Sequence, residues 1–473
     1  MALNKTVYIG PFIHCESLNQ LDICTNGMIG VGEDGKIAFV SRDMKGRQLP
    51  AQEGWEHAKM VYTRQYGFFF PGFIGESDRA MNTTAVLTDL DTHIHASQYP
   101  NAGVFGKSTL LDWLNTYTFP LESSFSDLDR AARIYNRVVA RTLSHGTTTA
   151  AYYATVHVAA TNLLADICKS RGQRAFVGRV CMDRLSPDYY QDESVESAIH
   201  DTQACIDHIK YIDPQFDLVT PIITPRFAPS CTDETLAALG KLHRDTGLPC
   251  QTHISENKKE IELVKELFPN HDSYTHVYDQ AGLLTPKTIL AHAIHLSSEE
   301  RSLIKTRQAK ISHCPASNTA LTSGRAAVRT MLDEGMTVGL GTDVSGGYTS
   351  SMLTEAREAI FVSRHVAMES GDEAKLSVEE ALYLATRGGA QVVGLEDRIG
   401  GFEVGKDWDA QLVRLDGVGD TVGLDPRAGL VEIFGDETWD EKVAKWVYTG
   451  DDRNTMAVWV KGRLVHSRES FKP

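Results

Sequence analysis

The chain has 473 residues, of which 42% are hydrophobic and 23% are charged, so it is long and apolar enough to bury a large core as a soluble globular protein. Its formal net charge of -15 at pH 7 repels phosphate backbones, and we therefore expect no binding to nucleic acid. No stretch is long and apolar enough to cross a bilayer, so we expect no membrane insertion.

Residues 1–67 contain short β-prone runs, such as TVYIGPFI and KIAFVS, with turn residues between them. These runs are too few to form a stable sheet alone. They predict one part of a small β domain.

Residues 68–400 alternate short β-type runs with amphipathic helical patterns. The runs are, in chain order, FFFPGFI or AVLTDLDTHIH, TTTAAYYA, RAFVGRVC, VTPIITPRF, PCQTHIS, TILAHAIHL, AKISHCP and TVGLGTD. Glycine follows several helical stretches, as at Gly172 and Gly247, where a left-handed cap is required. Eight strand signals with helical connectors predict a (β/α)8 TIM barrel.

Residues 401–473 return to short β-prone runs, such as AQLVRL and MAVWVKGRLVH. Because neither end of the chain can form a sheet alone, we predict that the two ends pair. The expected fold is an α/β protein in which a TIM barrel lies beside a small β-sandwich domain built from 1–67 and 401–473.

The strongest chemical signal is the segment Asp91-Thr-His93-Ile-His95-Ala-Ser-Gln98. Residues two apart on a strand face the same way, so His93 and His95 can share one metal ion. Alone this pattern is weak, because two histidines can also be satisfied by ordinary hydrogen bonds.

Further signals fall at the ends of later strand runs. His253, with Glu256 three residues on, ends the fifth run, His292 ends the sixth, and Asp343 ends the eighth. Active sites of barrel enzymes are built at these carboxyl ends. Three imidazoles and one carboxylate suit Zn²⁺, with iron as an alternative, and an open position would hold a water whose pKa falls to ~7. We predict one such ion per subunit.

Ten motifs carry a resemblance to a known family: DTHIHASQ, WLNTYTFP, HGTTTA, GQRAFVGRVCMD, TPRF, HISEN, HCPASN, GLGTDVSGGY, GFEVGKDWDA and GDDRN. Together they resemble the guanine deaminases of the amidohydrolase superfamily, from about residue 60 to near the C-terminus. The His-x-His pattern marks only the superfamily. HASQ, the arginine of TPRF and the tryptophan segment narrow the resemblance to the guanine deaminase branch.

The resemblance implies hydrolytic deamination of guanine, with water, to xanthine and ammonia. It implies that Glu256 shuttles the proton, that His292 orients the attacking water, and that Asp343 acts as both ligand and base. The implied metal ligands are His93, His95, His253 and Asp343. The implied purine-binding residues are His95, Gln98, Trp113, Leu114, Arg226, Phe227 and Glu256.

Selectivity for guanine needs a donor opposite O6, and Arg226 offers a planar, permanently charged set of donors. Adenine presents an amine at that position, where donor would meet donor. The alternative for Arg226 is a surface salt bridge. Phe227 is either a stacking surface or part of the core, and Trp113 could be simple packing.

Residues 75–90 depart from the family pattern, which runs directly from PGF-(I/V) into DTHIHA. AVLTDLDTHIH could replace the first half of the strand and leave FFFPGFI as an outward loop. Alternatively, Ile74 could abut Asp91 while 75–90 bulges outward. A third account is an in-frame retained intron in the gene model.

Rival functions stay open. Adenosine-type deaminases, triazine hydrolases and cyclic amidases use the same scaffold. Binuclear amidases carry a carbamylated lysine after the fourth strand, whereas that run here ends in Pro225-Arg226-Phe227, which favours one metal. From another class, the chain could be a scaffold that kept the barrel and lost catalysis, although such relatives lose metal ligands.

The eight cysteines are scattered without a CxxC pair, and the N-terminus lacks the pattern of a secretory signal. We therefore predict a reduced, cytosolic (cytoplasmic) protein with free thiols. Large barrel enzymes often pair, so we expect a homodimer.

Overall fold

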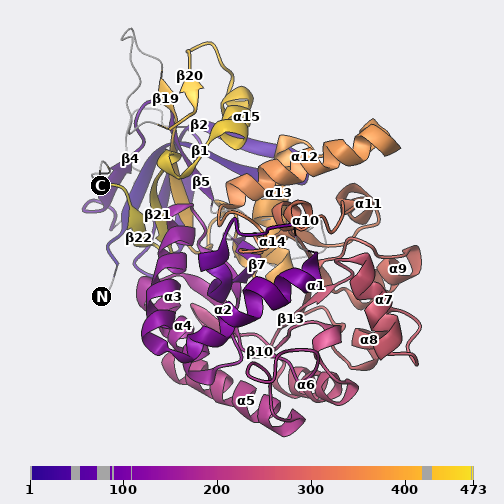
Figure 1. Cartoon of the computed structure of the whole chain (residues 1–473). Coiled ribbons are helices and arrows are strands. Elements are labelled where there is room, and N and C mark those ends of the chain that lie inside the picture. Colours follow the sequence, from indigo (N-terminus) through magenta and orange to yellow (C-terminus); the bar gives the residue numbers. More distant parts are fainter. Residues whose placement is uncertain are drawn as a thin grey trace.

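Eight parallel strands surround the centre of the larger part of the chain (Figure 1). They are β7 (Leu90–His95), β8 (Thr149–Tyr153), β9 (Arg174–Gly178), β11 (Val219–Pro221), β13 (Cys250–Ile254), β14 (Thr288–His292), β15 (Lys310–His313) and β16 (Val338–Leu340). They pair in two groups of four, β11-β9-β8-β7 and β13-β14-β15-β16. The computed structural model describes residues 3–43, 54–71, 86–87, 90–107, 109–417, 429–469 and 471.

Main-chain hydrogen bonds join the two groups of strands at both seams. At one seam the amide of Gln251 donates to the carbonyl of Ile223, with an N to O distance of 2.9 Å. At the other seam the amide of Asp343 donates to the carbonyl of His93 at 2.8 Å. The ring of strands is therefore closed, as the predicted (β/α)8 barrel requires.

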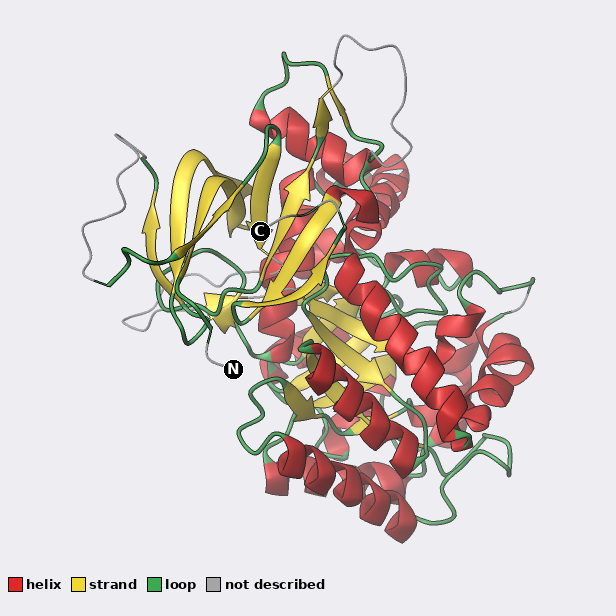
Figure 2. Cartoon of the chain, turned by 90° about the vertical axis from the view of Figure 1, so that its left-hand side faces the viewer, coloured by secondary structure: helices red, strands yellow, loops and turns green. Residues whose placement is uncertain are grey.

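Helices follow the strands and lie outside the ring (Figures 1 and 2). They are α3 (Leu128–Ser144), α4 (Val158–Arg171), α5 (Val195–Ile212), α6 (Asp233–Thr246), α7 (Lys258–Leu267), α8 (Tyr274–Gln280), α9 (Ser298–Arg307), α10 (Pro315–Ala320), α11 (Val328–Asp333), α12 (Met352–Ser370), α13 (Val378–Tyr383) and α14 (Gly389–Val393). Gly172 and Gly247 end α4 and α6 with φ of 79° and 65°, the left-handed geometry expected of glycine caps. Within the described ranges, no helix combines the length and hydropathy that crossing a membrane requires.

Both ends of the chain contribute to a second, eight-stranded sheet (Figure 2). Its strands are β1 (Thr6–Ser17), β2 (Gln20–Val31), β3 (Ile37–Ser41), β4 (Lys59–Tyr62), β5 (Gly67–Pro71), β18 (Ala410–Arg414), β21 (Thr455–Val460) and β22 (Arg463–Ser467). The antiparallel pair of β5 and β18 joins the N-terminal strands to the C-terminal ones. The predicted pairing of the two chain ends is therefore present.

This terminal sheet curves around its own core. The amide of Trp408, just before β18, donates to the carbonyl of Gly35, just before β3, at 2.7 Å, although β3 and β18 are not neighbours in the sheet. Ile37 of β3 and Trp459 of β21 belong to the same buried cluster. Side chains from distant strands thus share one apolar interior, which is the sandwich-like packing predicted from the chain ends.

The run FFFPGFI differs from its prediction. Residues 67–71 form β5 of the terminal sheet, so they are neither the first barrel strand nor an outward loop, and the barrel begins with β7. Phe69 faces the core of the sheet, while Phe68 and Phe70 pack on Trp446 of α15 (Trp439–Thr449), with ring centroids 5.5 and 5.0 Å away. A strand buried on both faces has the same continuous apolar sequence in either domain.

The segment 75–90 lies largely outside the described residues. Within it, β6 (Val86–Leu87) pairs in parallel with β17 (Asp397–Ile399), and β7 begins at Leu90. Residues 75–85 and 88–89 are not described. The account that leaves FFFPGFI as an outward loop is wrong, because residues 67–71 belong to β5. The bulge of 75–90 between Ile74 and Asp91 and the retained intron remain hypotheses.

Candidate active site

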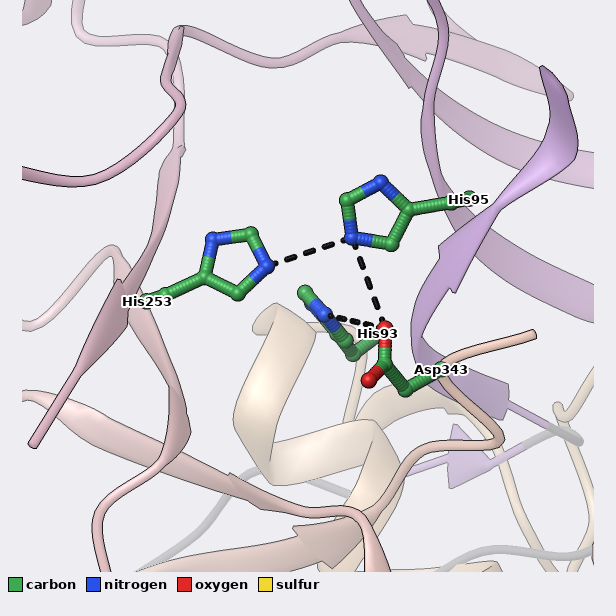
Figure 3. Close-up of side chains that lie close together, drawn as sticks. All are labelled: His93, His95, His253 and Asp343. Atoms are coloured by element: carbon green, nitrogen blue, oxygen red, sulfur yellow. Dashed lines mark hydrogen bonds and ion pairs between the residues drawn. The ribbon is translucent and has the colours of Figure 1, made fainter. Parts of the chain in front are cut away.

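Three histidines and one aspartate meet at the carboxyl end of the barrel strands (Figure 3). His93 and His95 come from β7, His253 from β13, and Asp343 follows β16. His95 Nε2 lies 3.2 Å from His253 Nε2, and Asp343 Oδ1 lies 3.1 Å from His93 Nε2 and 3.4 Å from His95 Nε2. One potential ligand atom from each residue lies within 4.8 Å of all the others.

This donor set fits a divalent cation. The Nδ1 atom of His253 lies 2.6 Å from the carbonyl oxygen of Arg226, so an Nδ1–H donates there and the Nε2 lone pair faces the cluster. Burial lowers the pKa of His95 and of His253 well below the usual range, which favours the neutral, ligating form. Two ring nitrogens that face each other at 3.2 Å are best satisfied by a shared cation. Three imidazole nitrogens and a carboxylate oxygen are a ligand set that Zn²⁺ accepts.

A carboxyl group and an imidazole beside this cluster can exchange protons with a ligand. Glu256 Oε2 lies 3.5 Å from His292 Nε2, and both side chains are buried. Burial raises the pKa of Glu256, as a general acid near neutral pH requires. Burial lowers the pKa of His292, but the carboxylates of Glu256 and Asp343 outweigh this effect and raise it overall. Two residues fix the pair: Asn318 Oδ1 lies 2.9 Å from His292 Nδ1, and Ser323 Oγ donates to Glu256 Oε1 at 2.8 Å.

The backbone is strained where two of these side chains leave it. His292 has a φ of 71° and Asp343 a φ of 45°, a region that residues other than glycine rarely occupy. Each such residue costs on the order of 1–3 kcal/mol and persists only when its surroundings impose it. At Asp343 the constraint includes the hydrogen bond to the His93 carbonyl that closes the barrel. Strain of this kind concentrates at functional sites.

A cavity of about 390 Å³, including its open mouth, adjoins the four residues. Its lining is His95, Gln98, Leu110, Trp113, Leu114, Arg226, Phe227, His253, Glu256, His292, Leu321 and Asp343. One wall is a continuous helical segment made of α1 (Leu110–Trp113), the π-helical turn η2 (Leu114–Thr118) and α2 (Phe119–Ser123). Single π-helical turns occur frequently at functional sites.

Arg226 lines one side of this cavity and is buried, with 2% of its surface exposed. Its Nη1 and Nη2 atoms lie 2.6 and 3.3 Å from the two carboxylate oxygens of Glu122. The guanidinium carbon also lies 5.2 Å from the ring centroid of Phe119. The alternative of a surface salt bridge is therefore wrong, since the pair that Arg226 makes is buried and adjoins the cavity.

The sequence of the chain is similar to those of known proteins. Residues 68–465 match the Amidohydrolase family. A probable guanine deaminase of Schizosaccharomyces pombe is 48% identical over 98% of this chain and 84% of that protein. The guanine deaminase of Homo sapiens is 39% identical over 97% of this chain and 96% of that protein. The chain belongs to the amidohydrolase family, in its guanine deaminase branch.

A solved structure of an amidohydrolase of this branch has the same fold throughout. The guanine deaminase from C. acetobutylicum, solved with guanine bound in its active site, superposes with a TM-score of 0.83 at 37% identity. The superposition covers 98% of this chain and 100% of that chain.

The fold brings the sequence-predicted site residues of this amidohydrolase together. The predicted ligands form the four-residue cluster, and the predicted purine-binding residues all line the adjoining cavity. Their roles stay predictions, since distance alone does not assign a function.

Sequence reasoning missed several residues of the site, namely Leu110, Glu122, Asn318, Leu321 and Ser323. Glu122 follows the WLNTYTFP motif by two residues, but its partner Arg226 lies 104 positions away. Asn318 belongs to the HCPASN motif, which carried the resemblance without a role for its last residue. Only tertiary contacts identify these residues.

Proposed function

We propose that this member of the amidohydrolase family hydrolyses guanine to xanthine and ammonia. The observation that carries the proposal is the combination of a four-residue cluster that could hold a metal ion and a buried, carboxylate-held arginine beside one cavity of about 390 Å³. His95, His253 and Asp343 of the cluster line this cavity together with Arg226. The similarity of 39–48% to guanine deaminases over nearly the whole chain supports the same substrate.

The cavity suits an uncharged purine. Arg226 would donate to O6 of guanine, and Phe227, Trp113 and Leu114 would enclose the rings. With O6 held at Arg226, C2 would be turned toward Glu256 and His292, which line the same cavity. Adenine carries an amine in place of O6, so its donor would meet the donors of Arg226.

The metal would be one Zn²⁺ held by His93, His95, His253 and Asp343, and it would lower the pKa of a water molecule to near neutral, so that the water can act as the nucleophile. Asp343 would accept the proton that this water loses on attacking C2. Glu256 would give a proton to N3 as C2 becomes tetrahedral, while His292 holds the attacking oxygen in line. Asp343 would then pass the proton that it took from the water to the exocyclic nitrogen, and the C2–N bond would break to release ammonia. Glu256, left as a carboxylate, would take the proton of the new C2 hydroxyl, so that the C2 carbonyl of xanthine forms.

The test is a spectrophotometric assay of guanine conversion to xanthine, run beside adenine and a triazine and paired with metal analysis. We expect guanine to be turned over and adenine to be disfavoured by about 10⁴-fold or more. Preference for adenine or a triazine would assign the chain to another activity of the scaffold. Inactive, metal-free protein would favour the scaffold role without catalysis.

We also infer that the protein is a cytosolic homodimer. Scattered cysteines suit a reducing compartment, and large barrel enzymes commonly pair. Light scattering should give twice the chain mass of 52.2 kDa, and a single chain mass would contradict the dimer.

Loading the metal-free protein with zinc or with iron, followed by measurement of its activity, distinguishes the two candidate metals.

A further inference from the structure

The side chain of Glu122 has no solvent exposure and receives hydrogen bonds from three other side chains. Besides Arg226, the Nε2 atom of Gln98 donates to its Oε1 at 2.8 Å and the hydroxyl of Tyr190 donates to its Oε2 at 2.8 Å. Two of these partners, Arg226 and Gln98, line the cavity, whereas Glu122 itself does not. A buried carboxylate is costly unless hydrogen-bond donors surround it. Because Arg226 and Gln98 are two of these donors, Glu122 is connected through them to the cavity wall.

We propose that Glu122 is the positioning residue for base recognition: its carboxylate fixes the donors of Arg226 and the amide of Gln98 toward the edge of the base that carries O6. This inference rests on the proposed deamination of guanine. Glu122 would not touch the base and would act only through these two side chains.

The contact with Glu122 fixes the plane of the Arg226 guanidinium. The carboxylate accepts from both terminal nitrogens, at 2.6 and 3.3 Å, in the paired geometry that gives such contacts their directionality. The ring of Phe119 packs on the guanidinium as well. Of the five N–H donors of an arginine, Glu122 takes two, and the sulfur of Met182, 3.9 Å from Nη1, takes another. The remaining donors keep a set direction for a ligand oxygen.

The same carboxylate selects one orientation of the Gln98 amide. A carboxylate only accepts hydrogen bonds, so the Nε2 side of the amide must face Glu122. The Oε1 side then lies 3.5 Å from the main-chain nitrogen of Ser345, which donates. The contacts with Glu122 and Ser345 require the same orientation of the amide. Gln98 therefore presents to a base one N–H and one acceptor oxygen whose positions are fixed.

Glu122 also balances the charge at the cavity. A buried arginine alone would attract anionic ligands, whereas the pair of Arg226 and Glu122 is neutral overall. A neutral wall with directed donors suits an uncharged base with a carbonyl oxygen. Glu122 lies in α2, the last part of the continuous helical segment that also supplies Trp113 and Leu114 to the cavity wall. This segment therefore holds the carboxylate at a fixed distance from the wall.

The experiment compares the parent protein with Glu122→Gln, which keeps the shape of the side chain but turns an amide N–H₂ toward the donors of Arg226 or Gln98. We measure KM and kcat for guanine, the metal content, and the KM or inhibition constant for 2-aminopurine, which has the C2 amine but no oxygen at C6. A hydrogen bond to a charged group changes binding by roughly 10- to 100-fold. We expect KM for guanine to rise by about that factor, kcat to change less than about threefold, and the preference for guanine over 2-aminopurine to fall by a similar factor.

The matched control is Asp407→Asn. Asp407 Oδ2 lies 3.0 Å from Arg174 Nη2 in another buried pair, at the amino end of β9 and away from the cavity. This variant should lose stability but keep the KM for guanine and the preference over 2-aminopurine. A purely structural role for Glu122 would make the two variants behave alike.

Tyr190→Phe provides a second variant in case Glu122→Gln does not fold. It removes one hydrogen bond to Glu122 without touching the cavity, and we expect a change of KM in the same direction by a few fold.

Two results would overturn the proposed role of Glu122 and leave the proposed function of the protein standing. One is a parent protein that deaminates guanine while Glu122→Gln keeps its KM and its preference. The other, if that variant does not fold, is Tyr190→Phe with both constants unchanged. A parent that neither binds nor deaminates guanine would overturn the proposed function and this inference together.

Discussion

The Nδ1 atom of His253 lies 2.6 Å from the carbonyl oxygen of Arg226. This contact joins a metal-ligand candidate to the residue proposed to recognise the base. Arg226 follows β12 (Thr224–Pro225), and the main chain of Phe227 forms a parallel bridge with His253. The distance between the metal centre and the recognition group is therefore set by two adjacent strand ends rather than by a mobile loop.

Replacing His253 with alanine should empty the metal site. The variant keeps three ligands at most, so we expect metal content below about one tenth per chain and loss of guanine turnover, with the circular dichroism spectrum unchanged. The control is His208→Ala, on the surface of α5, where the ring pairs with Asp166. Full metal content in His253→Ala would show that the ligand is another residue.

Replacing Glu256 with glutamine should separate chemistry from metal binding. The amide cannot carry a proton to the base, so kcat should fall by ~10²–10⁴-fold, while metal content stays at that of the parent. Ser323→Ala, which removes the hydrogen bond to Glu256 Oε1, should lower kcat much less. A Glu256→Gln variant with parental kcat would remove Glu256 from the proton path.

Replacing Arg226 with lysine should weaken guanine binding. Lysine keeps the charge but loses the planar set of donors, and it cannot reach both oxygens of Glu122 in the same way. We expect KM for guanine to rise by roughly 10- to 100-fold, measured at constant metal content. A KM within about twofold of the parent would contradict the role of Arg226, given that directed donors carry this contact.

Replacing Arg174 with methionine should destabilise the fold without changing catalysis. Arg174 Nη2 lies 3.0 Å from Asp407 Oδ2 and 3.5 Å from Asp409 Oδ2, and all three side chains are buried. The variant leaves two buried carboxylates without this cation, so the free energy of unfolding should fall by about 3–5 kcal/mol in urea titrations.

The control for that prediction is Lys241→Met, which breaks an exposed pair with Asp245 one helical turn away. Such a pair contributes about 0.3–0.5 kcal/mol, so its loss should be barely measurable. Equal destabilisation in the two variants would mean that burial of the Arg174 cluster has no special weight.

Local patterns in the sequence predicted which side chains meet at the barrel rim because strand geometry is periodic. His93 and His95 share a face by alternation, and His253, His292 and Asp343 lie at or near strand ends, which a barrel brings to one rim.

Glu122 could not be predicted in this way, since its role depends on side chains from three distant segments.

The prediction for the run FFFPGFI was wrong for a different reason. Phe68, Phe69 and Phe70 are buried on both faces, and a continuous apolar run does not indicate which sheet a strand joins.

Turnover that depends on one metal ion per chain is the property on which the proposed mechanism rests. The direct measurement is to remove metal from the parent protein with a chelator, dialyse it, and titrate Zn²⁺ while following guanine conversion to xanthine. We expect no turnover before the addition of Zn²⁺, a linear recovery of activity as Zn²⁺ is added, and a break in the titration at one equivalent. Undiminished turnover in the metal-free protein, or a break at two equivalents, would contradict it.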